Sequence, residues 1–223
     1  ELPIDGVSGQ TIVDAIKAHG AVPAEVVGGV PQAHHAVGNA LREGDMLITL
    51  GAGNVHEAGA RIARDQAVLE DIIGRCGEAN GKVHLYEPMR KHTTMLVGGP
   101  AQFWVEPQTH HCFASAVSYC RERGIPVRVI GRGSNLVVGD GGIRGVVIHP
   151  SKGAFGEVSV EGDTVTAGAG VRFKKLASVA LKAGLTGFEW MEGIPGNVGG
   201  GLRMNAGAMG ADTFDQVVEV TFL

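Results

Sequence analysis

The pattern of apolar and polar residues along the chain predicts five helices. The first begins after Ser8, whose hydroxyl suits an N-cap, carries Ile12 and Ile16, and ends at Gly20. Pro31 can open the second helix, because a proline at the first helical position lacks only an N–H group that would have no partner there. The predicted helices cover residues 9–19, 31–41, 55–73, 109–123 and 172–182.

Short apolar runs between these helices predict strands. Residues 46–50 form a run of the buried-strand type, and Gly51–Asn54 and a helix follow it, so an α/β unit is expected there. Farther along, Glu161-Gly-Asp163 joins two short β-type runs, which indicates a hairpin. Several strands with few helices favour an α+β domain over a doubly wound one. The predicted strands cover residues 46–50, 102–105, 127–130, 146–149, 157–160, 164–167 and 217–223.

The charge balance changes along the chain and predicts a domain boundary. Residues 1–80 hold five Lys and Arg against eleven Asp and Glu, a net charge of −6, whereas residues 81–223 carry +2. The change falls in a polar, Gly-bearing stretch around Cys76–Lys82, which has the composition of a linker. We therefore expect domains at residues 1–75 and 87–223, joined by a linker at 76–86.

Composition excludes several classes of protein. With 44% apolar residues the chain can bury a core, and because no apolar run reaches about 18 residues, membrane insertion is not expected. The absence of a basic stripe with interleaved aromatic residues argues against nucleic acid as a partner. The three cysteines, an odd number without CxxC spacing, indicate neither a disulfide framework nor a metal site, and a reduced cytoplasmic protein is the simplest interpretation.

Glycine is the unusual residue, with 36 copies, about twice the average share. In the first cluster an apolar strand runs into Gly131-Arg-Gly-Ser-Asn135. Two glycines allow positive φ angles and let backbone N–H groups converge on an anion such as a diphosphate. A tight hairpin turn is the alternative for this cluster.

A second cluster, Glu192–Gly210, contains seven glycines, and we expect it to lie outside helix and strand interiors, where glycine is unfavourable. A flat heteroaromatic ring lying against backbone needs such a lack of side chains. The alternative is a flexible surface loop, but the apolar Ile194, Val198 and Leu202 argue against it. A third cluster, Ala167–Gly170, fits a plain strand-to-helix connection and a ligand contact equally well.

Three separated motifs resemble a known family. The segments Thr93–Ala101, Gly131–Asn135, and Gly193–Gly200 together with Asn205–Gly210 are similar, in this order, to the three motifs of UDP-N-acetylenolpyruvoylglucosamine reductases, the MurB family of peptidoglycan and cell-wall precursor synthesis. The similarity covers about residues 87–223. It implies an α+β FAD-binding domain of the PCMH type, with two α+β subdomains that hold FAD between them.

The resemblance also implies which residues bind the cofactor and how. Some members of the wider superfamily attach FAD through a His in the first loop; Ser134 and Asn135 stand here instead, so FAD is expected to be noncovalent. The implied FAD-binding residues, with one glycine added from the third cluster, are Gly131, Arg132, Gly133, Ser134, Asn135, Leu136, Gly168, Gly193, Ile194, Pro195, Gly196, Val198, Gly199, Gly200, Asn205, Gly207 and Ala208.

In the family reaction, NADPH reduces FAD, and the reduced flavin passes the hydride to the enolpyruvyl double bond of a UDP-sugar. An Arg and a Glu stabilise the carbanionic intermediate, and a Ser donates the last proton. The family motifs for these three residues are expected after Leu223, and Ser134, Glu192 and Arg203 belong to flavin motifs. No catalytic residue is therefore assigned.

Residues 1–75 show a second resemblance. The Gly44–Asn54 segment, preceded by a helix start at Ser8–Thr11, is similar to the C-terminal part of UDP-N-acetylmuramate–L-alanine ligases, the MurC family. This resemblance implies a partial α/β Rossmann-like segment and a fragment of a fusion of consecutive pathway enzymes. No phosphate-binding G-x-x-x-x-G-K-[ST] loop is present, so ATP activation by this segment alone is not expected.

Two other functions stay open at this point. One is a PCMH-type flavin dehydrogenase that acts on a different hydroxy acid or alcohol. The other is a ligase-derived module that is either non-catalytic or dependent on ATP.

Overall fold

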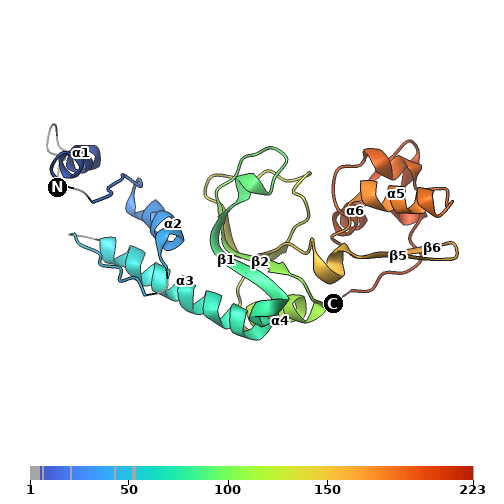
Figure 1. Cartoon of the computed structure of the whole chain (residues 1–223), viewed down its shortest axis with the longest axis horizontal. Helices are drawn as coiled ribbons and strands as arrows, with labels where there is room; N and C mark the ends of the chain where they lie inside the picture. Colours follow the sequence, from blue (N-terminus) through green and yellow to red (C-terminus); the bar gives the residue numbers. More distant parts are fainter. Residues whose placement is uncertain (1–5, 7, 21, 43, 52–53, 223) are drawn as a thin grey trace. The chain divides into compact units, whose positions relative to one another are not determined.

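The chain forms two compact units. The computed structural model describes residues 6, 8–20, 22–42, 44–51 and 54–222. Unit 1 is Glu1–Ala63 and unit 2 is Arg64–Leu223, and helix α3 (Val55–Cys76) begins in the first and ends in the second (Figure 1). The division precedes the linker predicted at residues 76–86, because the second half of α3 packs into the core of unit 2.

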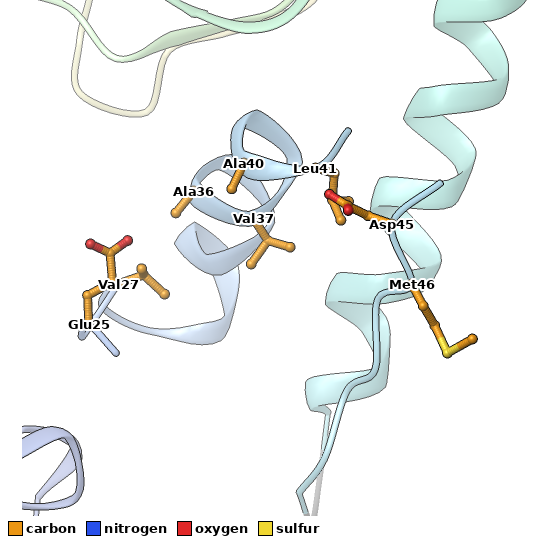
Figure 2. Close-up of a pocket in the computed structure, with 8 residues that line it drawn as sticks. All are labelled: Glu25, Val27, Ala36, Val37, Ala40, Leu41, Asp45 and Met46. Atoms are coloured by element: carbon orange, nitrogen blue, oxygen red, sulfur yellow. The ribbon is translucent and has the colours of Figure 1, made fainter. Parts of the chain in front are cut away.

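Unit 1 contains the first two predicted helices. Helix α1 (Gly9–His19) begins at Ser8, whose hydroxyl accepts a hydrogen bond from the backbone N–H of Thr11, so the predicted cap is confirmed. Helix α2 (Val30–Ala40) has its proline in the first turn, as expected. Side chains of segment 25–27, of α2 and of segment 41–46 line a hollow of about 450 Å³ (Figure 2).

The strand predicted at residues 46–50 is not formed. This segment has irregular backbone, and Met46 and Leu50 are 83% and 85% exposed. A strand needs a neighbour for its backbone hydrogen bonds, and none of the sheets includes a described residue of unit 1. The α/β unit expected in residues 1–75 is therefore absent from the described part, where only helices and irregular segments occur; the turn residues 52–53 lie outside the described residues.

The first lobe of unit 2, residues 64–149, is built on a four-stranded sheet. Its strands are β1 (Gly81–Pro88), β2 (Pro100–Pro107), β3 (Val127–Val129) and β4 (Ile143–Ile148), in the order β1-β2-β4-β3. Strands β1 and β2 are antiparallel, whereas β4 is parallel to both β2 and β3. Helix α4 (His110–Arg123) connects β2 with β3 and begins at Thr109, as predicted.

Alternating side chains place a core on each face of this sheet. On one face, Phe103 of β2 and Val146 of β4 pack against Ile72 of α3 and Cys112 of α4. On the other face, Trp104 packs with Met89 and Ile130, which precede the Thr93–Ala101 and Gly131–Asn135 motifs. The second half of α3 thus covers the sheet with α4, and the three buried cysteines lie among its apolar contacts.

The linker predicted at residues 76–86 is wrong in its second half. Residues 81–86 belong to β1, which pairs with β2 from Gly81↔Pro107 to Pro88↔Pro100. The polar composition that indicated a linker reflects an edge strand, in which every second side chain is exposed over the first part of β1.

The second lobe, residues 150–222, carries the predicted hairpin and the glycine-rich segment. Strands β5 (Val158–Glu161) and β6 (Thr164–Ala167) form the hairpin, and α5 (Phe173–Lys182) follows as predicted. Helix α6 (Val198–Met204) and the short strands β7 (Gly207–Ala208) and β8 (Ala211–Asp212) were not predicted. The core of this lobe contains Val171, Phe173, Leu176 and Trp190. Together the lobes give the expected α+β architecture of two subdomains.

The strand predicted at residues 217–223 is absent from its described part. Residues 217–222 have irregular backbone without a pairing strand, and Leu223 lies outside the described residues. Among the helices that the structure describes, none has the length and apolarity that a membrane span needs. The described residues also contain no group of three or more metal-ligating side chains.

Candidate functional site

The first two glycine clusters, distant in sequence, lie against each other. The Ser134 hydroxyl donates a hydrogen bond to the carbonyl oxygen of Pro195 over 3.0 Å. A Cβ atom added to Gly131 would lie 2.7 Å from Oδ1 of Asn197, and one added to Gly196 would lie 3.2 Å from the Ser134 hydroxyl. The loop at the end of β3 and the segment before α6 therefore form one continuous surface between the lobes of unit 2.

The Thr93–Ala101 motif holds the Gly131–Leu136 loop, here called the first loop, in place. The backbone N–H of Thr94 donates to the carbonyl oxygen of Gly133 over 3.2 Å, and the Thr93 hydroxyl donates to the carbonyl oxygen of Val97 over 2.8 Å. Gly133 has a φ angle of +63°, and a Cβ atom there would come within 3.0 Å of the His92 carbonyl oxygen. Glycine is thus required at this position by its backbone angle and by its neighbour.

A stack of three rings lies beneath this loop. The rings of His92 and Trp104 are 3.9 Å apart between centroids, and those of Trp104 and His149 are 5.1 Å apart. The Nδ1 atom of His149 lies 3.1 Å from the carbonyl oxygen of Ile130, so Nδ1 carries the proton and donates it to this acceptor. Burial lowers the pKa of His149 below its ordinary value, which favours the neutral ring. The stack therefore anchors the residue that precedes the glycine loop.

The third glycine cluster packs against the second. The backbone N–H of Gly199 donates a hydrogen bond to the carbonyl oxygen of Ala169 over 2.9 Å, and the backbone N–H of Val198 donates one to the carbonyl oxygen of Val171 over 2.8 Å. Cβ atoms at Gly168 or Gly170 would come within 3.0 Å of backbone atoms in the turn near Phe155. Close backbone packing thus explains these two glycines, which agrees with the strand-to-helix connection that the sequence left open.

The second cluster is partly helical, contrary to prediction. Gly199, Gly200 and Gly201 lie inside α6. A Cβ atom at Gly201 would come within 3.0 Å of two ring carbons of Phe173, and one at Gly199 would lie 2.8 Å from the Cβ of Ala169, whereas Gly200 faces open space. Two of these glycines are therefore needed for close helix packing, which outweighs their poor helix propensity.

The predicted site residues differ in how open they are. Gly133 is buried, and Asn205 uses its Oδ1 to accept the backbone N–H of Phe214 over 2.9 Å, within its own lobe. Asn205 also ends α6 in the left-handed conformation. Those that are half-buried are Gly131, Ser134, Gly168, Ile194, Gly196, Val198, Gly199, Asn205 and Ala208, and those exposed are Arg132, Asn135, Leu136, Gly193, Pro195, Gly200 and Gly207.

Sequence reasoning missed Asn197, which lies at the centre of the contact. Its side chain is buried, with a residue exposure of 4%. The Nδ2 group donates a hydrogen bond to the carbonyl oxygen of Gly170, and the buried acceptor Oδ1 has no hydrogen-bond partner in the part of the chain that the structure describes. Nothing in the sequence separates Asn197 from other turn residues, because its role depends on segments near residues 131 and 170 that only the fold brings together.

Known proteins are similar to a large part of the chain. A family model described as "FAD binding domain" matches residues 101–223. A protein of Clostridium botulinum is 46% identical over 151 residues, which are 68% of this chain and 47% of that protein. A protein of Bradyrhizobium sp. is 47% identical over 154 residues, which are 69% of this chain and 50% of that protein. Both relatives are named UDP-N-acetylenolpyruvoylglucosamine reductase. The chain spans about half the length of each of these curated relatives.

A solved structure is also similar. The UDP-N-acetylenolpyruvylglucosamine reductase of Thermus caldophilus matches with a TM-score of 0.47 and 34% sequence identity, over 59% of this chain and 44% of that chain.

Proposed function

Because the chain belongs to the FAD binding domain family, we propose that unit 2 is the flavin-binding part of a reductase of UDP-N-acetylglucosamine-enolpyruvate. The names of the relatives support this substrate, and NADPH is the proposed hydride donor. The product would be UDP-N-acetylmuramate, a precursor of peptidoglycan. The single observation that carries the proposal is the contact between the two glycine segments through Ser134 and Pro195.

The residues at this contact fit FAD. Gly131 and Gly133 remove side chains from the first loop, and the exposed Arg132 offers a positive charge to a diphosphate. Gly193 and Gly200 present open space where a planar ring needs backbone without side chains. Bound FAD would accept a hydride from a nicotinamide and transfer it to a carbon–carbon double bond.

Several residues of this chain have a proposed part in that chemistry. The Gly131–Leu136 loop binds the diphosphate, and Gly193–Gly200 passes along the flavin. His149 and Trp104 act through the loop by anchoring Ile130, so they are positioning residues. No residue here is assigned to proton transfer or to stabilisation of charge on the substrate.

We propose that FAD is held without a covalent bond. The first loop offers no His or Cys side chain, and all three cysteines are buried in the first lobe. Acid precipitation of the flavin-loaded protein should therefore release all flavin into the supernatant. Flavin that remained with the precipitated protein would contradict this.

FAD titration of the protein tests the proposal, with a matched pair of variants. Gly133→Ala adds a methyl group to a residue with φ +63° and meets the His92 carbonyl, so it should lower FAD affinity by at least about tenfold. Gly139→Ala adds the same group to an exposed position with nothing within 4 Å and should bind like the wild type. Quenching of flavin fluorescence measures both affinities. A wild-type protein that ignores FAD, or equal binding by the two variants, would refute the assignment.

The substrate class needs a separate test on the flavin-loaded protein. Reduction of bound flavin by NADPH, and not by hydroxy acids or alcohols, supports the reductase. Reduction by a hydroxy acid alone would instead favour a PCMH-type dehydrogenase of another substrate class.

The ligase interpretation of residues 1–75 remains a proposal that rests on the Gly44–Asn54 motif. The strand predicted within this motif is not formed, which removes part of its support. The reading frame upstream of Glu1 provides the test: a phosphate-binding loop and ligase motifs there would support a fusion, and an unrelated sequence would reject it. ATP binding by the present chain is not expected.

A further inference from the structure

We propose that Asn197 binds FAD by accepting a hydrogen bond at Oδ1 from a hydroxyl group of the ribityl chain. This inference rests on the proposed function, since it assigns one contact within the same site. It adds a ligand-binding residue that the sequence motifs did not identify.

The orientation of the Asn197 amide follows from its neighbour. The carbonyl oxygen of Gly170 can only accept a hydrogen bond, so the amide must present Nδ2 to it. This leaves Oδ1 pointing away from Gly170. The amide also lies between the antiparallel bridge of Arg172 with Asn197 and the start of α6, so its backbone is held on both sides.

The Oδ1 atom has no donor among the described residues. It is buried, and most buried side-chain polar atoms have a partner. Asn197 stands at the N-cap of α6, where an Asn side chain commonly accepts a backbone N–H group, yet this cap bond is not made. The acceptor is therefore available for a donor from outside the chain.

The surroundings of Oδ1 belong to the proposed cofactor site. Oδ1 faces Gly131, where an added Cβ would lie only 2.7 Å away. The Ser134 hydroxyl joins these two segments directly by its hydrogen bond to the carbonyl oxygen of Pro195. The proposal requires that bound FAD displaces the first loop from Asn197 so that the ligand donor reaches Oδ1, and this displacement would break the exposed Ser134–Pro195 hydrogen bond.

The chemistry of FAD indicates which group supplies the donor. A phosphate is anionic and would be repelled by a carbonyl oxygen, so the diphosphate does not fit at Oδ1. Asn197 contacts Gly131 of the diphosphate loop and lies within the segment proposed for the flavin ring. The ribityl chain joins these two parts of FAD, and its hydroxyl groups are donors. The N3–H group of the flavin ring is the other donor on that side of the molecule.

A binding cycle with FAD analogues tests this contact. The affinities of wild type and Asn197→Ala are measured by fluorescence quenching for FAD, for analogues in which one ribityl hydroxyl is replaced by hydrogen, and for 3-methyl-FAD. We expect one deoxy analogue to bind the wild type about tenfold more weakly than FAD. The variant should bind FAD about tenfold more weakly than the wild type does, and should bind that analogue as well as it binds FAD.

Comparing ligands within one protein separates this contact from the loss of the Gly170 bond, which affects all ligands equally. A variant that still discriminates against the deoxy analogue, or a wild type that binds every deoxy analogue like FAD, would overturn the proposal. If the variant ceased to discriminate only between FAD and 3-methyl-FAD, the donor would be the N3–H group of the flavin ring, and the proposed ribityl contact would also be overturned. If the variant does not fold, the wild-type series can still overturn the proposal, and a wild type that binds no FAD would reject the proposed function itself.

Discussion

Adjacent glycines of α6 should respond differently to the same substitution. Gly200→Ala and Gly201→Ala each add one methyl group to the middle of the helix. The Gly200 methyl meets nothing within 4 Å, whereas the Gly201 methyl comes within 3.0 Å of the Cε2 and Cζ atoms of Phe173. The pair therefore separates the packing role of glycine from its backbone role.

The size of the effect follows from two terms. Replacing glycine by alanine inside a helix stabilises it by about 1 kcal/mol, and this term applies to both variants. Carbon atoms pack at about 3.5–4.0 Å, so the Phe173 ring would have to move, and overpacking of this kind costs about 1–3 kcal/mol or more. Phe173 is 1% exposed and lies 6.1 Å from the ring of Trp190, so it has little room to move.

We expect Gly200→Ala to be up to about 1 kcal/mol more stable than the wild type, and Gly201→Ala to be less stable than Gly200→Ala by about 1–3 kcal/mol or more. Urea unfolding without FAD, followed by tryptophan fluorescence, measures both changes in the free energy of unfolding, because Trp190 lies in the same core. Equal stabilities would refute the packing explanation and would restore the interpretation that the whole glycine run serves ligand approach.

Two further predictions concern buried groups of the first lobe. Tyr86→Phe removes the donor that holds the buried Asp65 carboxylate at 2.6 Å, so it should destabilise the protein by about 1–3 kcal/mol in urea unfolding. The control Tyr119→Phe removes a bond to Asp71, whose side chain is 51% exposed, and should cost less than about 1 kcal/mol; an equal loss would contradict this account. The lowered pKa of His149 in the folded protein means that the unfolded chain takes up the proton first. The stability contributed by His149 is therefore fully present above its ordinary pKa of 6.5 and is lost as the pH falls through the lower, folded value. His149→Gln should flatten the decline in unfolding free energy as the pH falls below 6.5, and an unchanged profile would reject this role.

Local signals were sufficient to predict the α-helices other than α6 and three of the four strands of the larger sheet of unit 2. The Ser8 and Thr109 caps and the hairpin turn at residues 161–163 act over a few neighbouring residues, so they can be recognised in the sequence. The same holds for the glycine loop after β3, because its motif is contiguous. These features depend on backbone angles and hydrogen bonds within one segment.

Other features depended on partners that the sequence does not reveal. Residues 46–50 have the composition of a strand but no strand beside them, whereas residues 81–86 look like a linker and pair with β2. Whether an extended segment becomes a strand is decided by a neighbour that satisfies its N–H and C=O groups.

The glycines and polar residues of the site show the same distinction. The chain by itself predicted a ligand site at the glycine-rich segments, since that prediction needs only residue types and order, and it stays a prediction. Only the tertiary structure shows that the Phe173 ring packs where a side chain at Gly201 would lie, and that the Asn197 amide donates a hydrogen bond to the Gly170 carbonyl oxygen. Both contacts join segments more than twenty-five residues apart, and contacts at that separation exist only after the backbone has folded.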